Sequence, residues 1–205
     1  MTSFVRNECR VLFVHVPKTG GTSVERLFIE AGFERGLFAT RDFEGPCSPQ
    51  HYDAALLRER LALSDFDLVF TVVRHPLDRL LSEYNFRMNV RQRQKQLPPV
   101  EFPEWLQQVM RRYKHNPYVQ DNHLRPQSEF ITERCIVLRY EAGLAPAMAK
   151  LVATSPLLQF AGDFGPMPRR QTTKEQFVTR DNVAVGDLAQ IRNWYARDFD
   201  ELGYA

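Results

Sequence analysis

The sequence predicts an α/β protein, with a mostly parallel sheet flanked by helices and a single domain over residues 1–205. Three short apolar runs, at residues 11–16, 68–73 and 135–139, have the length and composition of buried strands. Segments with helical spacing of apolar residues separate them, and such alternation is typical of parallel sheets. A chain of 205 residues is long enough to bury one core without disulfides or metals.

The first strand is expected to lead directly into a helix. The run 11–16 is followed by a turn at Gly20 and Gly21, and Thr22 or Ser23 can cap the helix that begins there.

Further helices are expected wherever apolar residues recur every three or four positions. They are predicted at residues 52–63, from 77 past 84, around 104–113, at 143–152 and at 185–199. Glycine and proline clusters at 40–50 and 160–172 predict loops.

Composition and charge exclude several classes of protein. The net charge of +2 is too small to indicate nucleic-acid binding, although basic residues concentrate over 87–95 and 111–115. No apolar run approaches the ~20 residues that span a bilayer. Residues 1–10 are polar and do not form a signal peptide, so we expect a cytoplasmic protein. The three cysteines lack the spacing of a disulfide framework or a zinc site.

The segment from His15 to Ser23 has the features of an anion-binding loop. A strand delivers Lys18 into a glycine turn, and a helix begins directly afterwards. The glycines let backbone N–H groups approach an anion, and the helix N-terminus adds further donors and partial positive charge. The hydroxyls of Thr19, Thr22 and Ser23 add to this donor set. The expected ligand is a phosphate-like group.

The order of residues in this loop differs from a Walker A loop, where lysine follows the glycines. The segment 17–22, Pro-Lys-Thr-Gly-Gly-Thr, resembles instead the 5′-phosphosulfate loop of sulfotransferases, in the carbohydrate (heparan and chondroitin) branch. The resemblance implies a P-loop-like fold. It also implies that Lys18, Thr19, Gly20, Gly21, Thr22 and Ser23 hold the donor 3′-phosphoadenosine 5′-phosphosulfate (PAPS).

A second anion motif follows the second strand, 56 residues on when counted from Lys18 to Arg74. Arg74 leaves the strand end, and Ser82 lies roughly two turns into the next helix. An arginine fork and a hydroxyl are suited to clamp one phosphate. The pattern resembles the 3′-phosphate motif of sulfotransferases, with Arg74 and Ser82 as the binding pair. Because ligands sit beyond the carboxyl ends of parallel strands, we expect both motifs at one site.

Shorter resemblances to the same family extend along the chain. They are Leu138–Glu141, Asn122–Gln127 and Tyr195–Tyr204. The resemblance of Asn122–Gln127 implies that His123 and Arg125 contact the acceptor. The loop Pro168–Thr172 departs from the family pattern, although Arg169 or Arg170 could still close over the nucleotide.

Sulfuryl transfer needs a base for the acceptor proton and a positive group near the leaving oxygen, a role that suits Lys18. We expect His51 to be the base, because related heparan-modifying enzymes carry a histidine in a similar interval and histidine titrates near neutral pH. The alternatives are His15, Asp42, Glu44 and His123. The chemistry needs no metal, and no cluster has ligand spacing.

Two other functions compete with a sulfotransferase. One is a P-loop-type nucleotide kinase or NTPase with an unusual loop, which magnesium dependence would reveal. The other is a non-catalytic module that binds anionic glycans through the basic face at 87–95. The family resemblance favours a carbohydrate acceptor, and a small hydroxylated metabolite or a tyrosine is the alternative. The sequence leaves the oligomeric state open.

Overall fold

The computed structural model describes residues 1–37, 43–155, 158 and 175–205. Contacts divide the chain into two compact units. We call Met1–Arg74 with Glu129–Arg170 the sheet unit, and His75–Ser128 with Gln171–Ala205 the helical unit.

The sheet unit contains a five-stranded sheet in the order β3-β1-β2-β4-β5. The strands are β1 (Thr2–Arg6), β2 (Cys9–Val14), β3 (Glu34–Gly36), β4 (Leu68–Val73) and β5 (Cys135–Arg139). β2 pairs parallel with β4, and β4 pairs parallel with β5, whereas β1 runs antiparallel to both β2 and β3. Every strand except β1 therefore points the same way, which confirms the mostly parallel α/β sheet.

The hairpin between β1 and β2 was not expected from the sequence. Its turn residues Asn7 and Glu8 have φ angles of 47° and 67°, and two successive positive φ values match the twist of a two-residue hairpin. The tight turn lets β2 begin at Cys9 rather than at residue 11, and it adds β1 to the sheet.

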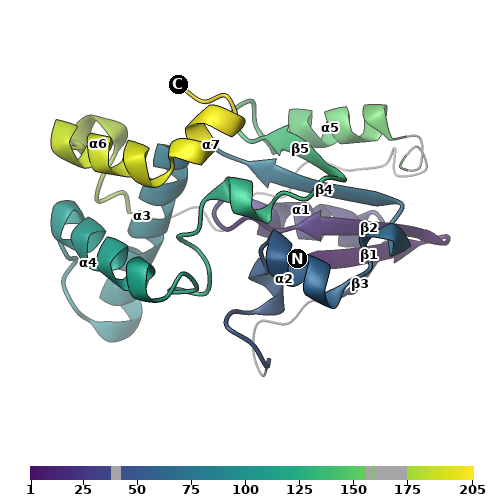
Figure 1. Cartoon of the computed structure of the whole chain (residues 1–205), viewed down its shortest axis with the longest axis horizontal. Helices are drawn as coiled ribbons and strands as arrows, with labels where there is room; N and C mark the ends of the chain where they lie inside the picture. Colours follow the sequence, from purple (N-terminus) through teal and green to yellow (C-terminus); the bar gives the residue numbers. More distant parts are fainter. Residues whose placement is uncertain (38–42, 156–157, 159–174) are drawn as a thin grey trace. The chain divides into compact units, whose positions relative to one another are not determined.

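Helices cover the sheet on both faces (Figure 1). In this view α1 (Gly21–Glu30) lies behind the strands and α2 (Ala54–Arg60) lies in front of them. α5 (Leu144–Thr154) packs beside β5. Between α1 and the sheet, Phe28 stacks on Phe4 at 4.6 Å and on Phe70 at 5.6 Å between ring centroids. Each ring is fully buried, a contribution of roughly 1.5–3 kcal/mol apiece.

The helical unit is built from α3 (Pro76–Lys95), α4 (Phe102–His115), α6 (Val185–Trp194) and α7 (Ala196–Glu201). α3 starts with Pro76 in its first turn, where the missing N–H costs nothing. Tyr84 packs edge-on against Phe102 and Trp105, at 5.2 Å from each ring. The described residues of the two units also form short 3₁₀ helices: η1 (Pro49–His51), η2 (Leu63–Asp65), η3 (Gln127–Phe130) and η5 (Arg180–Asn182).

Candidate anion-binding site

The loop between β2 and α1 contains two left-handed residues and is closed by a side-chain hydrogen bond. Lys18 has a φ of 70° and Gly20 a φ of 87°, so the chain turns twice through the left-handed region. The buried Thr19 hydroxyl donates to the Val16 carbonyl at 2.8 Å. Thr19 is therefore left with its N–H, rather than its hydroxyl hydrogen, for a ligand.

Two glycines in this loop are favoured for different reasons. A Cβ on Gly21 would lie 2.1 Å from Nε2 of His15, so the imidazole ring leaves no room for a side chain there. A Cβ on Gly20 would lie 2.7 Å from the flexible end of Leu144 and 3.2 Å from Tyr140, and the positive φ of 87° itself favours glycine at this position.

The first turn of α1 completes the donor set. Gly20 is the N-cap, and its carbonyl accepts from the N–H groups of Ser23 and Val24 at 2.9 and 3.3 Å. The N-cap therefore lies two or three residues before the expected caps, Thr22 and Ser23. The N–H groups of Gly21 and Thr22 lie in the first turn of the helix, where N–H groups have no carbonyl acceptor within the helix.

Arg74 approaches this loop from the end of β4. Its Nη1 donates to the Lys18 carbonyl at 3.5 Å, and its guanidinium lies 4.8 Å from the centroid of the Tyr140 ring. The Tyr140 N–H in turn donates to the Val73 carbonyl at 2.9 Å. The residues that follow β2, β4 and β5 therefore meet, as expected for ligand sites at the carboxyl ends of parallel strands.

His51, the expected base, is buried at the end of η1 in the same unit. Its Nδ1 lies 3.3 Å from the Ser48 hydroxyl. Its ring packs edge-on against His15 at 5.3 Å between centroids. Because His15 also touches Gly21, His51 is one side chain removed from the loop.

A buried polar cluster beneath the loop was missed by sequence reasoning. Oε1 of Glu25 accepts hydrogen bonds from Thr2 at 2.8 Å and Gln50 at 3.1 Å, and lies 3.1 Å from Nδ1 of His15. Burial alone would raise the pKa of Glu25, but these hydrogen bonds and the charge of His15 lower it to about 2. The apolar spacing around Glu25 gave its position on α1, but not its partners in β1 and η1.

The remaining expected site residues lie in the helical unit. Ser82 is half-buried on α3. Nδ1 of His123 lies 2.8 Å from Oε2 of Glu83, and Nε of Arg125 donates to Oδ1 of Asn122 at 2.7 Å.

Arg79, the second arginine of the Arg74–Ser82 motif, has a structural position. It is only 1% exposed, and it donates to the carbonyls of His123 at 2.9 Å and Arg125 at 2.7 Å. Arg79 thereby fixes the 123–125 segment against α3. The neighbouring Asp78 pairs with Arg180 at 2.5 Å.

Other candidates differ in how they are placed. Glu44 is exposed, and His15 is buried, as expected for a histidine packed behind the loop. Asp42, Arg169 and Arg170 lie outside the described residues, as does the loop expected at 160–172.

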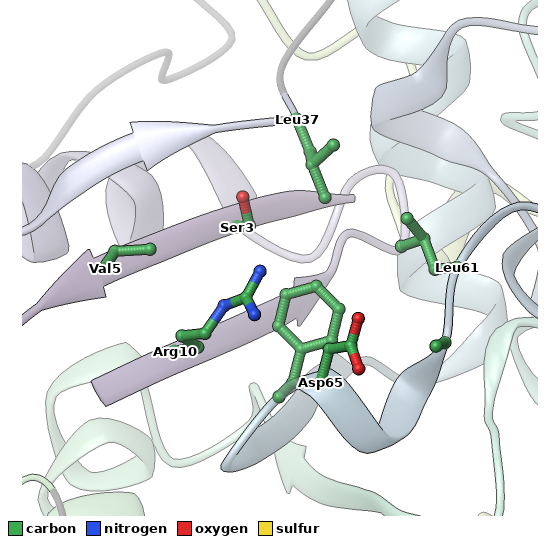
Figure 2. A pocket seen from close by; sticks show the side chains of 8 residues that line it. Ser3, Val5, Arg10, Leu37, Leu61 and Asp65 are labelled. Carbon is green, nitrogen blue, oxygen red and sulfur yellow. The ribbon is translucent and has the colours of Figure 1, made fainter. Parts of the chain in front are cut away.

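A separate pocket of about 200 Å³ lies in the sheet unit (Figure 2). Its lining comprises Ser3, Val5, Arg10, Leu37, Leu61, Ala62, Asp65 and Phe66. The Arg10 guanidinium lies 5.7 Å from the centroid of the Phe66 ring. Since Arg10 lies near the start of β2 and the anion loop follows its end, we assign this pocket no part in anion binding.

The fold and the loop define a class of α/β protein with an anion site at the carboxyl ends of its parallel strands. Residues 1–205 match the sulfotransferase family, so the chain belongs to that family of sulfuryl-transferring enzymes. Neither a curated protein nor a solved structure matches the chain. Among the described residues, no helix has the length and apolar character needed to cross a bilayer.

Proposed function

We propose that this sulfotransferase uses PAPS as its donor and a carbohydrate hydroxyl as its acceptor. The observation that carries the donor assignment is the contact between Arg74 and the Lys18 carbonyl. This contact brings the Lys18 loop, which is suited to a 5′-phosphosulfate, next to Arg74, which is suited to a 3′-phosphate. The tight packing under Gly20 and Gly21 fits a loop that presents bare backbone to an anion.

The loop residues act on the donor side of the reaction. PAPS supplies an activated sulfuryl group: the acceptor oxygen bonds to sulfur as the bond from sulfur to the bridging phosphate oxygen breaks, leaving 3′,5′-adenosine bisphosphate. The Lys18 ammonium stabilises charge on that bridging oxygen. The N–H groups from Thr19 to Thr22 orient the 5′-phosphosulfate.

On the acceptor side, His51 takes the hydroxyl proton. Its Nδ1 faces the Ser48 hydroxyl, so we assign Nε2 as the nitrogen that accepts the proton of the acceptor hydroxyl. Family resemblance supports His123 and Arg125 as acceptor contacts, and Arg79 holds the backbone of both. No step in this scheme requires a metal ion.

The 3′-phosphate is assigned to Arg74 and Ser82. The Tyr140 ring under the guanidinium limits the orientations of Arg74, which lowers the entropy lost on binding. The assignment of Ser82 rests on the motif.

Calorimetry tests the donor assignment. The protein should bind 3′,5′-adenosine bisphosphate more tightly than ATP with magnesium, because only the bisphosphate carries both groups that the motifs suit. Arg74→Ala should weaken binding of the bisphosphate by ~10–100-fold, far more than it weakens binding of 5′-AMP. Magnesium-dependent ATP binding of equal strength would point to a kinase or NTPase instead.

The acceptor assignment needs a transfer assay. Labelled PAPS is offered with a panel of glycans and small hydroxylated metabolites. Transfer to glycans supports a carbohydrate acceptor, whereas transfer to metabolites alone contradicts it.

A further inference from the structure

A buried carboxylate lies one helical turn from the start of the anion loop's helix. Glu25 is 4% exposed, and its oxygen Oε1 is surrounded by Thr2, Gln50 and His15. Thr2 and Gln50 are neutral donors. Among these contacts only His15 can carry a positive charge.

An uncompensated negative charge at this position would oppose the function of the loop. Buried charges are strongly destabilising unless they are paired. A carboxylate near a site for a phosphosulfate also repels the ligand, and the low dielectric of a protein interior strengthens that repulsion. Glu25 therefore needs a positive partner between itself and the loop.

The position of His15 meets this need. Its Nδ1 lies 3.1 Å from Oε1 of Glu25 and 3.0 Å from Nε2 of Gln50, and its Nε2 is the atom nearest to the space where a Gly21 Cβ would stand. The ring is fixed by stacking on Phe13 at 5.4 Å and by the edge contact with His51 at 5.3 Å. The imidazole thus stands between the carboxylate and the first turn of α1.

We propose that His15 is a positioning residue of the anion loop, kept protonated by Glu25, with its positive Nε2 edge supporting the turn that binds the 5′-phosphosulfate. This inference rests on the proposed function of the loop. Other charged or titratable groups nearby are His51 on η1, Lys18 in the loop, and the Met1 amino group, which donates to the Pro49 carbonyl at 2.9 Å.

A set of three variants separates charge from packing. His15→Asn keeps a donor toward Glu25 but leaves the carboxylate charge uncompensated, so the Kd for 3′,5′-adenosine bisphosphate should rise ~10-fold. His15→Asn with Glu25→Gln removes both charges and should recover part of that loss. Glu30→Gln, an exposed carboxylate on the same helix, is the control and should bind like wild type. A double variant no better than His15→Asn overturns the proposal.

The pH dependence provides a readout that packing alone would not move. The ratio of wild-type to double-variant Kd should rise across the pH range in which nitrogen NMR shows His15 losing its proton, whereas titration of the ligand is common to both proteins. A constant ratio overturns the proposal.

Nitrogen NMR of the wild-type imidazoles reads the charge of His15 directly, even if the variants fail to fold. A neutral His15 at pH 7 overturns the inference, and an imidazolium supports it. If wild type does not bind the bisphosphate at all, the proposed function fails, while the NMR result still decides the state of His15.

Discussion

At the scale of single residues, Lys18 combines a strained backbone with a proposed chemical role. Its φ of 70° is uncommon for a residue with a side chain. Such strain persists only where the surroundings fix the conformation. Arg74 holds the Lys18 carbonyl and Thr19 closes the loop onto Val16, so the fold supplies that constraint.

Variants at Lys18 should separate its charge from its backbone. Lys18→Ala and Lys18→Gly both remove the ammonium, but only glycine suits the positive φ. Both should weaken binding of 3′,5′-adenosine bisphosphate and slow transfer to a similar extent. A much milder effect of Lys18→Gly would show that loop conformation, rather than charge, dominates.

His51 should behave differently, because it is assigned to the acceptor proton. His51→Ala should leave bisphosphate affinity nearly unchanged while turnover falls ~10²–10⁴-fold, and the acid limb of the pH–rate profile should disappear. Normal turnover would move the role of base to Glu44 or Asp42. Loss of donor binding would instead place His51 in the nucleotide site.

At the scale of elements, the strand–loop–helix unit depends on glycine beneath the anion site. Gly21→Ala places a methyl group against His15, whose ring is held by Phe13 and Glu25. We expect a loss of about 1–3 kcal/mol in unfolding free energy, measured by urea denaturation. Gly186→Ala on α6 is the control, because a Cβ there meets nothing within 4 Å. It should be neutral or stabilise by up to ~1 kcal/mol.

The contact itself can be tested with a double variant. Gly21→Ala combined with His15→Ala should lose less stability than the sum of the two single changes, since the second removes the ring that the new methyl group would meet. Strict additivity would show that Gly21 is required for another reason.

The sequence was most informative where a strand is one continuous apolar run. The ranges 68–73 and 135–139 coincide with β4, which is buried along its whole length, and with β5, the partly buried strand at the edge of the sheet. β1 was missed because its turn uses Glu8 where a glycine would signal a hairpin. β3 was missed because it is a short, exposed edge strand of Glu-Arg-Gly.

The candidate site was only partly predictable. The sequence predicted the anion loop and the position of Arg74, because both belong to short motifs whose residues lie close together in the sequence. The cluster around Glu25 joins Thr2, His15 and Gln50, which come from three separate segments. Such contacts depend on how β1 and η1 pack against α1, and the spacing of apolar residues along the sequence does not predict this packing.

At the scale of the whole molecule, buried polar contacts recur in both units. Asp198 of α7 is fully buried and accepts from the N–H groups of Gln127 and Ser128, each at 2.8 Å. In the sheet unit, buried Glu25 likewise accepts hydrogen bonds, in this case from the side chains of Thr2 and Gln50. Of the two, Glu25 has a pKa lowered by its contacts, so its ionisation links folding to pH.

The last prediction follows from the lowered pKa of Glu25, about 2 in the folded protein against an ordinary value of 4.5. A carboxyl with a depressed folded pKa stabilises the protein above its unfolded pKa, and this contribution is lost as pH falls from about 5 toward 2. The full contribution is roughly 3 kcal/mol. Urea unfolding at several acidic pH values should therefore show a smaller loss of unfolding free energy for Glu25→Gln than for wild type. Glu30→Gln, which changes an exposed carboxylate on the same helix, should follow wild type. Equal acid sensitivity of wild type and Glu25→Gln would mean that Glu25 is not held ionised by His15, Thr2 and Gln50.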